Sequence, residues 1–80
     1  MTLSEIQEKT KAFLVDELEI DEEKIIPEAR LREDLGIDSL EVVDVVVLVE
    51  QEFGLKMKPE DFKVIKTYGD FCDFILGKVA

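Results

Sequence analysis

The segment from Ser39 to Phe53 constrains the fold most, because it is long and rich in valine and lies between a typical helix-starting residue and a typical helix-ending residue. Its six valines have high β-propensity, but the run is longer than a typical strand and lacks two-residue alternation. Asp38 before it is a favourable helix N-cap, and Gly54 is the usual residue just past a helix end. We therefore predict a helix over 39–53.

This helix is predicted to have two different faces. At about 100° per residue, one stripe is apolar and is expected to face the core: Val42, Val46, Val49 and Phe53. A nearly opposite stripe mixes acidic and apolar residues and is expected to be exposed: Leu40, Asp44, Val47 and Gln51, with Glu41 and Leu48 beside it.

The N-terminal part is predicted to form a first helix followed by a long connection. Thr2 and Glu5 have the spacing of a capping box, and Ile6, Phe13 and Leu14 recur at roughly helical spacing. The helix should end near Leu18. Residues 19–38 lack a sustained period, so we expect an ordered loop with one short turn starting at Asp21. Its apolar anchors are Ile20, Ile25, Ile26, Leu31, Leu35 and Ile37. A structureless loop of this length is unusual and often functional.

Two further helices are predicted after Gly54. Pro59, followed by acids, is typical of the start of a short helix. Thr67 and Asp70 resemble a second capping box, opening a last helix that buries Phe71 with Phe74 or Ile75 and stops at Gly77. Residues 1–80 are therefore expected to form a single all-α domain. We predict a small four-helix bundle of three main helices and one short helix, with the long ordered loop between the first and second helices.

Composition excludes several classes of function. The chain has no histidine, so it cannot contain a Ser-His-Asp triad or a Cys-His dyad. Cys72 is the only cysteine and cannot form an internal disulfide or a structural zinc site. The acidic segment 21–32 lacks the glycine and the glutamate that an EF-hand loop requires at its sixth and twelfth positions. No catalytic residue and no metal site are predicted.

The charge pattern indicates which partners to expect. Twenty acids against ten bases give a net charge of −10, which disfavours nucleic acids and anionic membranes and favours basic protein surfaces. Between Glu33 and Phe53 there are seven acids and no lysine or arginine. This region is either a merely solvated face or a patch that steers basic partners. Without a signal peptide at the start or a bilayer-length apolar run, a cytoplasmic location without membrane insertion is expected.

The segment from Asp34 to Glu41 allows two interpretations. In the structural one, Asp38 and Glu41 form a capping box, Gly36 permits the preceding turn, and Ser39 is an ordinary first-turn residue. In the functional one, Ser39 carries a phosphate group, because a helix start favours an anion and the loop–helix junction is accessible to another enzyme. No neighbouring base activates Ser39, so a separate enzyme would have to modify it.

The residues Asp38-Ser39-Leu40 resemble the attachment motif of the acyl carrier proteins and the related peptidyl carrier domains. Leu35-Gly36 before the motif and the segment 50–54 after it stand at the family's spacing, and the resemblance covers nearly the whole chain. It implies that a magnesium-dependent phosphopantetheinyl transferase attaches 4′-phosphopantetheine to Ser39 from coenzyme A. The arm's thiol would then carry acyl intermediates as thioesters. The chain would be a free-standing, monomeric, non-catalytic carrier in fatty-acid biosynthesis.

The resemblance also implies a surface for partner enzymes with basic surfaces, on the second helix and the short helix. Its residues are Asp38, Leu40, Glu41, Asp44, Val47, Glu50, Glu60 and Asp61. A discrete polyketide or peptidyl carrier would share the fold and the arm, and an acidic helical interaction module without a prosthetic group is an alternative of another class.

Cys72 is expected to be a small core residue or to lie beside a cavity for the acyl chain.

Overall fold

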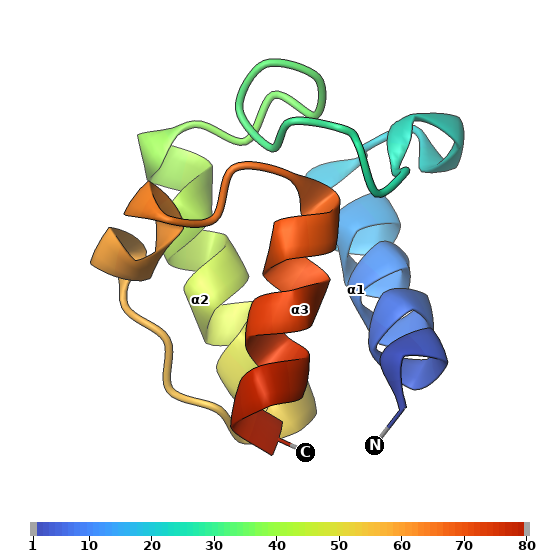
Figure 1. Ribbon diagram of the computed structural model, residues 1–80. Coiled ribbons are helices and arrows are strands. Elements are labelled where there is room, and N and C mark those ends of the chain that lie inside the picture. Colours follow the sequence, from blue (N-terminus) through green and yellow to red (C-terminus); the bar gives the residue numbers. More distant parts are fainter. Residues whose placement is uncertain (1, 80) are drawn as a thin grey trace.

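The computed structural model describes residues 2–79, most of which are helical (Figure 1). It contains the α-helices α1 (Leu3–Leu18), α2 (Ser39–Phe53) and α3 (Tyr68–Val79), and the 3-10 helices η1 (Glu22–Lys24) and η2 (Pro59–Lys63). The described residues contain no β-strand, only an isolated antiparallel bridge between Arg30 and Thr67. The predicted all-α bundle with a long loop between the first two main helices is confirmed.

The prediction of a four-helix bundle is wrong in one respect, because residues 2–79 form three α-helices and the short segment is 3-10 helical. In η2, Asp61 N–H donates to Lys58 O at 2.9 Å and Val64 N–H donates to Asp61 O at 3.3 Å. These are i→i+3 bonds, which close the tighter 3-10 turn. With five residues, η2 acts as a connector beside α2.

The predicted start of α1 and both predicted bounds of α2 are confirmed. The Thr2 hydroxyl accepts from Glu5 N–H at 3.2 Å, and Glu5 Oε1 accepts from Thr2 N–H at 3.3 Å. Helix α1 ends at Leu18, as expected. Helix α2 ends at Phe53, and Gly54 follows with φ of 66°. This left-handed conformation costs glycine little, and the Gly54 N–H donates to Glu50 O at 2.9 Å.

The start of α3 is also confirmed, but its end is not. Asp70 N–H donates to the Thr67 hydroxyl at 3.1 Å, and Thr67 N–H donates to the Asp70 carboxylate at 3.3 Å. The helix continues through Gly77 to Val79, so the predicted stop at Gly77 is wrong. Gly77 has no positive φ, and a glycine ends a helix when it adopts the left-handed conformation. Of the two alternatives for the buried partner of Phe71, Ile75 is fully buried.

The core lies between the three α-helices. Its largest contributions from α1 and α3 include Ile6, Leu14, Phe71 and Ile75. Figure 1 shows α3 in front, with α1 and α2 on either side of it. Among residues 2–79, no helix combines the length and the apolarity that crossing a bilayer requires.

Helix α2 faces the core along a slightly different line from the one predicted. Val49 is fully buried as expected. The other fully buried residue of α2 is Val45, whereas Val42, Val46 and Phe53 are only partly buried. Both α1 and η2 pack against α2. The stripe that faces the core is therefore centred on Val45 and Val49, and the three other residues flank it.

The connection between α1 and α2 is ordered by buried side chains. Asp21 caps η1 by accepting from Glu23 N–H at 3.1 Å, which confirms the predicted short turn. Five of the six predicted anchors are buried: Ile20, Ile25, Leu31, Leu35 and Ile37. Ile26 is 48% exposed, so its assignment as an anchor is wrong. Its carbonyl oxygen accepts from Ala29 N–H at 3.0 Å, and Ala29 is the buried residue of this turn.

Candidate functional site

Ser39 is the first residue of α2 and is exposed. None of the hydrogen bonds formed among residues 2–79 uses its hydroxyl group. The next side chain, Leu40, is 80% exposed, so no bulky neighbour of the described chain covers this helix end. The hydroxyl is therefore accessible to another enzyme, as the functional interpretation requires.

Asp38 fixes the start of α2. Its Oδ1 atom accepts from Leu40 N–H at 3.0 Å and from Glu41 N–H at 3.1 Å. The predicted N-cap is confirmed, but the reciprocal bond from Asp38 N–H to the Glu41 side chain is absent among the described residues, so the predicted capping box is only half formed. Two carboxylates at one helix end repel each other, which disfavours the return of Glu41 to this position.

The cap changes how a phosphate on Ser39 would be held. Two amides of the first turn, those of Leu40 and Glu41, already donate to the Asp38 carboxylate and are not free for a phosphate. A phosphodiester on Ser39 would also meet the negative charge of this carboxylate. The group would therefore be held by its covalent bond to the Ser39 oxygen rather than by the Leu40 and Glu41 amides.

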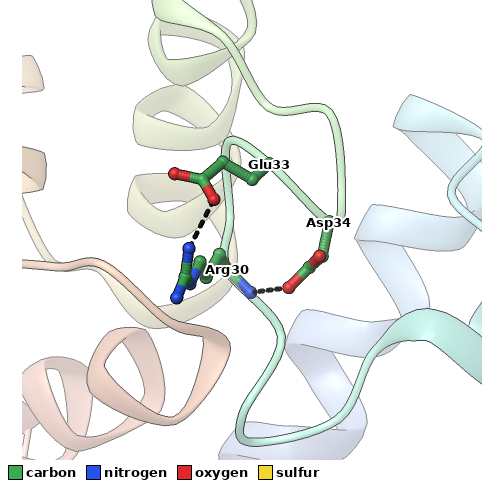
Figure 2. Close-up of polar contacts among 3 residues, drawn as sticks. All are labelled: Arg30, Glu33 and Asp34. Atoms are coloured by element: carbon green, nitrogen blue, oxygen red, sulfur yellow. Dashed lines mark hydrogen bonds and ion pairs between the residues drawn. The ribbon is translucent and has the colours of Figure 1, made fainter.

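The loop before Ser39 is held by a closed turn (Figure 2). Asp34 Oδ2 accepts from Arg30 N–H at 2.8 Å, and Asp34 N–H donates to Arg30 O at 2.9 Å. The Arg30 guanidinium donates to Glu33 Oε2 at 2.6 Å. This hydrogen bond, with the charges of Glu33 and Asp34, raises the pKa of Arg30. The turn fixes the direction in which the chain approaches α2.

Buried residues fix the segment between this turn and the start of α2. Leu35 and Ile37 are both buried, and Gly36 between them has φ of 69°, which confirms the predicted turn at this glycine. Ile37 N–H donates to Leu31 O at 2.8 Å, and Leu31 N–H donates to Lys66 O at 3.0 Å. The segment before Ser39 is thus anchored to the segment before α3, and the position of Ser39 is defined by the whole fold.

The outer face of α2 carries acids beside exposed apolar side chains. Leu40, Asp44, Val47 and Gln51 are all exposed, which confirms the predicted stripe. Glu50 is exposed as well, and Glu41 is partly buried. The sequence reasoning missed Val43, which is 52% exposed beside Val47 at 47%. The spacing of Val43, Val47 and Glu50, four and three residues, is the signal that places them on one face.

The two residues predicted on the short helix have different environments. Glu60 is exposed, whereas Asp61 is partly buried and its Oδ2 accepts from Lys58 N–H at 2.9 Å. Asp61 therefore has a structural role at the start of η2, as Asp38 has in α2. Both acids lie on η2, which packs against α2. They are therefore on an element next to the helix that begins at Ser39 (Figure 1).

A shallow groove separates the C-terminal turn of α1 from the middle of α2. Its volume is about 400 Å³, and it is lined by Glu17, Leu18, Asp44, Val47, Leu48 and Gln51. The α2 residues of the groove belong to the predicted outer stripe of that helix or lie beside it, whereas the residues on its α1 wall, Glu17 and Leu18, were not predicted. No local sequence pattern connects Glu17 to Asp44, because only the packing of the two helices brings them together.

Cys72 lies in the core, next to two other polar side chains. Its Sγ is 3.9 Å from the Thr10 hydroxyl oxygen, which is 2.7 Å from the Tyr68 hydroxyl oxygen. Burial raises the pKa of the Cys72 thiol, which keeps it protonated.

In the described part of the chain, no three acidic or thiol side chains are grouped so that they would hold a metal ion.

Comparisons with known proteins show the family of this chain. The family described as "Phosphopantetheine attachment site" matches residues 8–75, which include most of α1, all of α2 and most of α3. The acyl carrier protein of Thermosynechococcus vestitus (strain NIES-2133 / IAM M-273 / BP-1) is 46% identical over 80 residues, which cover 100% of this chain and 99% of that relative. With its helical bundle and an accessible serine at the start of α2, this chain belongs to the acyl carrier protein family, whose members are non-catalytic carriers with a phosphopantetheine prosthetic group.

Proposed function

We propose that Ser39 is the attachment residue and that the chain carries acyl groups in fatty-acid biosynthesis. The observation that supports this best is the exposed Ser39 hydroxyl, unbonded within residues 2–79, at the first position of α2. The phosphopantetheine group supplies a thiol that holds acyl groups as thioesters. The residues of this chain have to present the attachment oxygen and to recruit the enzymes that act on the arm.

Ser39 is presented but not activated. The sequence contains no histidine, and no side chain among residues 2–79 bonds to the Ser39 oxygen. The base that accepts the hydroxyl proton, and any metal that assists it, therefore belong to the transferase. Asp38 contributes by capping α2, and the turn at Arg30 and Asp34 fixes the preceding loop. Both hold the attachment oxygen in a defined place for the incoming enzyme.

The outer face of α2 recruits partners with basic surfaces. Leu40 and Val47 offer apolar contacts, and Asp44 and Glu50 offer negative charge on the same exposed side. Complementary charges of this kind accelerate encounter more than they tighten the final complex. Glu41 and Glu60 extend the negative surface, while Asp38 and Asp61 contribute charge in addition to their capping bonds.

The fatty-acid pathway, a cytoplasmic location and a monomeric carrier are parts of the same proposal. They are supported by full-length similarity to a relative named simply as an acyl carrier protein and by the net charge of −10, which disfavours self-association through this face.

A reconstitution tests the pathway. The protein carrying its arm is given acetyl and malonyl coenzyme A, NADPH and NADH, together with a malonyl transferase and the condensing, reducing and dehydrating enzymes of fatty-acid synthesis. In parallel it is given an amino acid, ATP and an amino-acid-activating enzyme of peptide synthesis. Mass spectrometry of the loaded chain then identifies the cargo. We expect malonyl loading and elongation to saturated acyl chains. Loading by the amino-acid-activating enzyme alone would overturn the pathway and favour a peptidyl carrier.

A further inference from the structure

We propose that the groove between α1 and α2 receives an apolar side chain of a partner protein, flanked by a lysine or arginine that pairs with Glu17 and Asp44. This inference rests on the proposed function and extends the docking surface from α2 onto α1. The groove is lined by apolar side chains, Leu18, Val47 and Leu48, and by the acids Glu17 and Asp44. Its lining therefore combines apolar side chains with negative charge.

The charges of the groove favour a cationic protein over other occupants. Glu17 and Asp44 are exposed, and the only ion pair found among residues 2–79 joins Arg30 and Glu33 elsewhere on the surface. The carboxylates of Glu17 and Asp44 therefore have no cation partner within the described chain. A lipid headgroup or a nucleic acid would bring a phosphate to these carboxylates and would be repelled. An apolar side chain with a lysine or arginine near it matches both the apolar and the acidic residues of the groove.

The position of the groove suits an enzyme that acts on a group at Ser39. Helices α1 and α2 run in opposite directions (Figure 1), and the C-terminal turn of α1 lies beside the middle of α2. Asp44 and Leu48 follow Ser39 by five and nine residues, about 8 and 14 Å along the helix axis at about 1.5 Å per residue. A partner seated in the groove is therefore held close to Ser39 without covering it.

The charge of the α1 wall is tested by comparing Glu17→Lys with Asp16→Lys. Asp16 is the exposed neighbour on the same helix and does not line the groove, so both variants change the net charge equally. The measurement is kcat/KM for loading by a broad-specificity phosphopantetheinyl transferase with coenzyme A, at low and at high ionic strength. We expect Glu17→Lys to lower kcat/KM about tenfold at low salt, and Asp16→Lys to lower it by less than about twofold. High salt should remove most of the difference.

The space of the groove is tested without changing charge. Gln51→Trp places a large side chain in the groove, and Ala12→Trp places one at an exposed position of α1 outside it. Circular dichroism checks that both variants keep their helices. We expect slower loading for Gln51→Trp and unchanged loading for Ala12→Trp. Equal kinetics for these two variants would overturn insertion into the groove.

Asp44→Lys separates failure of this inference from failure of the proposed function. If Asp44→Lys slows loading while Glu17→Lys loads at the same rate as Asp16→Lys, the partner does not contact the α1 side of the groove. The proposed binding of partners to the outer face of α2 is then retained. If Asp44→Lys also matches Asp16→Lys at low salt, both the groove and the α2 face are refuted. Attachment at Ser39 is measured separately, from the mass of the fully loaded protein, and does not depend on these rates.

Discussion

Replacing Tyr68 and Thr10, singly and together, tests whether a buried hydroxyl pair joins α1 to α3. Both residues are fully buried, and their hydroxyl oxygens are 2.7 Å apart. The Tyr68 hydroxyl also donates to Gln7 O at 3.0 Å, and the Thr10 hydroxyl lies 2.8 Å from Ile6 O. Each hydroxyl therefore has a backbone carbonyl of α1 as a second partner.

These second partners set the size of the expected effects. Removing one hydroxyl does not leave the other unsatisfied, because a carbonyl remains within reach, so the penalty should be near the value of one ordinary hydrogen bond. We expect Thr10→Val to lower the free energy of unfolding by about 1 kcal/mol, and Tyr68→Phe, which also loses the bond to Gln7, by about 1–2 kcal/mol. The double variant loses the shared bond only once. Its cost should therefore fall short of the sum by about 1 kcal/mol.

Urea denaturation followed by far-UV circular dichroism gives the four unfolding free energies of this cycle. Tyr68 is the only tyrosine and the chain has no tryptophan, so intrinsic fluorescence is unsuitable for comparing the variants. Valine and phenylalanine keep the approximate shapes of the replaced side chains, which limits cavity effects. If the two single costs add within about 0.3 kcal/mol, the hydroxyls do not interact and the reasoning is refuted.

Three other predictions concern the cap, the charge and the buried phenol. Asp38→Ala should cost about 1 kcal/mol of unfolding free energy, while Asp38→Asn should keep most of the cap; equal losses by chemical denaturation would contradict the role of the Asp38 oxygen. Added magnesium should raise Tm at low ionic strength by screening the net charge of −10, and a flat response would show that repulsion does not limit stability. Burial raises the pKa of Tyr68, so the folded state binds the phenol proton more tightly than the unfolded state does. The resulting stability is complete below about pH 10, the ordinary tyrosine pKa, and is lost as the pH rises above it. The unfolding free energy should then fall less steeply above this pH in Tyr68→Phe than in the wild type, and equal slopes would contradict the assignment.

Local patterns account for the parts of the fold that were predicted correctly. The capping pairs Thr2–Glu5 and Thr67–Asp70 act over three residues, and Gly54 ends α2 through its own backbone conformation. Such signals depend little on the rest of the molecule. The accessible Ser39 at the start of α2 follows from the same local reasoning, because Asp38 determines where the helix begins.

The features that escaped prediction depend on how the helices pack. Val45 is buried in α2, which packs against both α1 and η2. The groove at Glu17 and Asp44 and the contact between Thr10 and Tyr68 join residues that are far apart in the sequence. Helical periodicity identifies a stripe on one helix, but it does not specify which side chains of another helix lie opposite.

The central claim, that Ser39 carries the phosphopantetheine arm, is tested most directly by the intact mass of three proteins after incubation with coenzyme A, magnesium and a broad-specificity transferase. The wild type and the control Ser4→Ala, which removes an exposed serine of α1, should each gain one phosphopantetheine. Ser39→Ala should gain none, while its unfolding free energy stays within about 0.5 kcal/mol of the wild type, since Ser39 is an exposed residue without side-chain hydrogen bonds in the described chain. A mass increase of one arm in folded Ser39→Ala would contradict the claim and place the attachment at another residue.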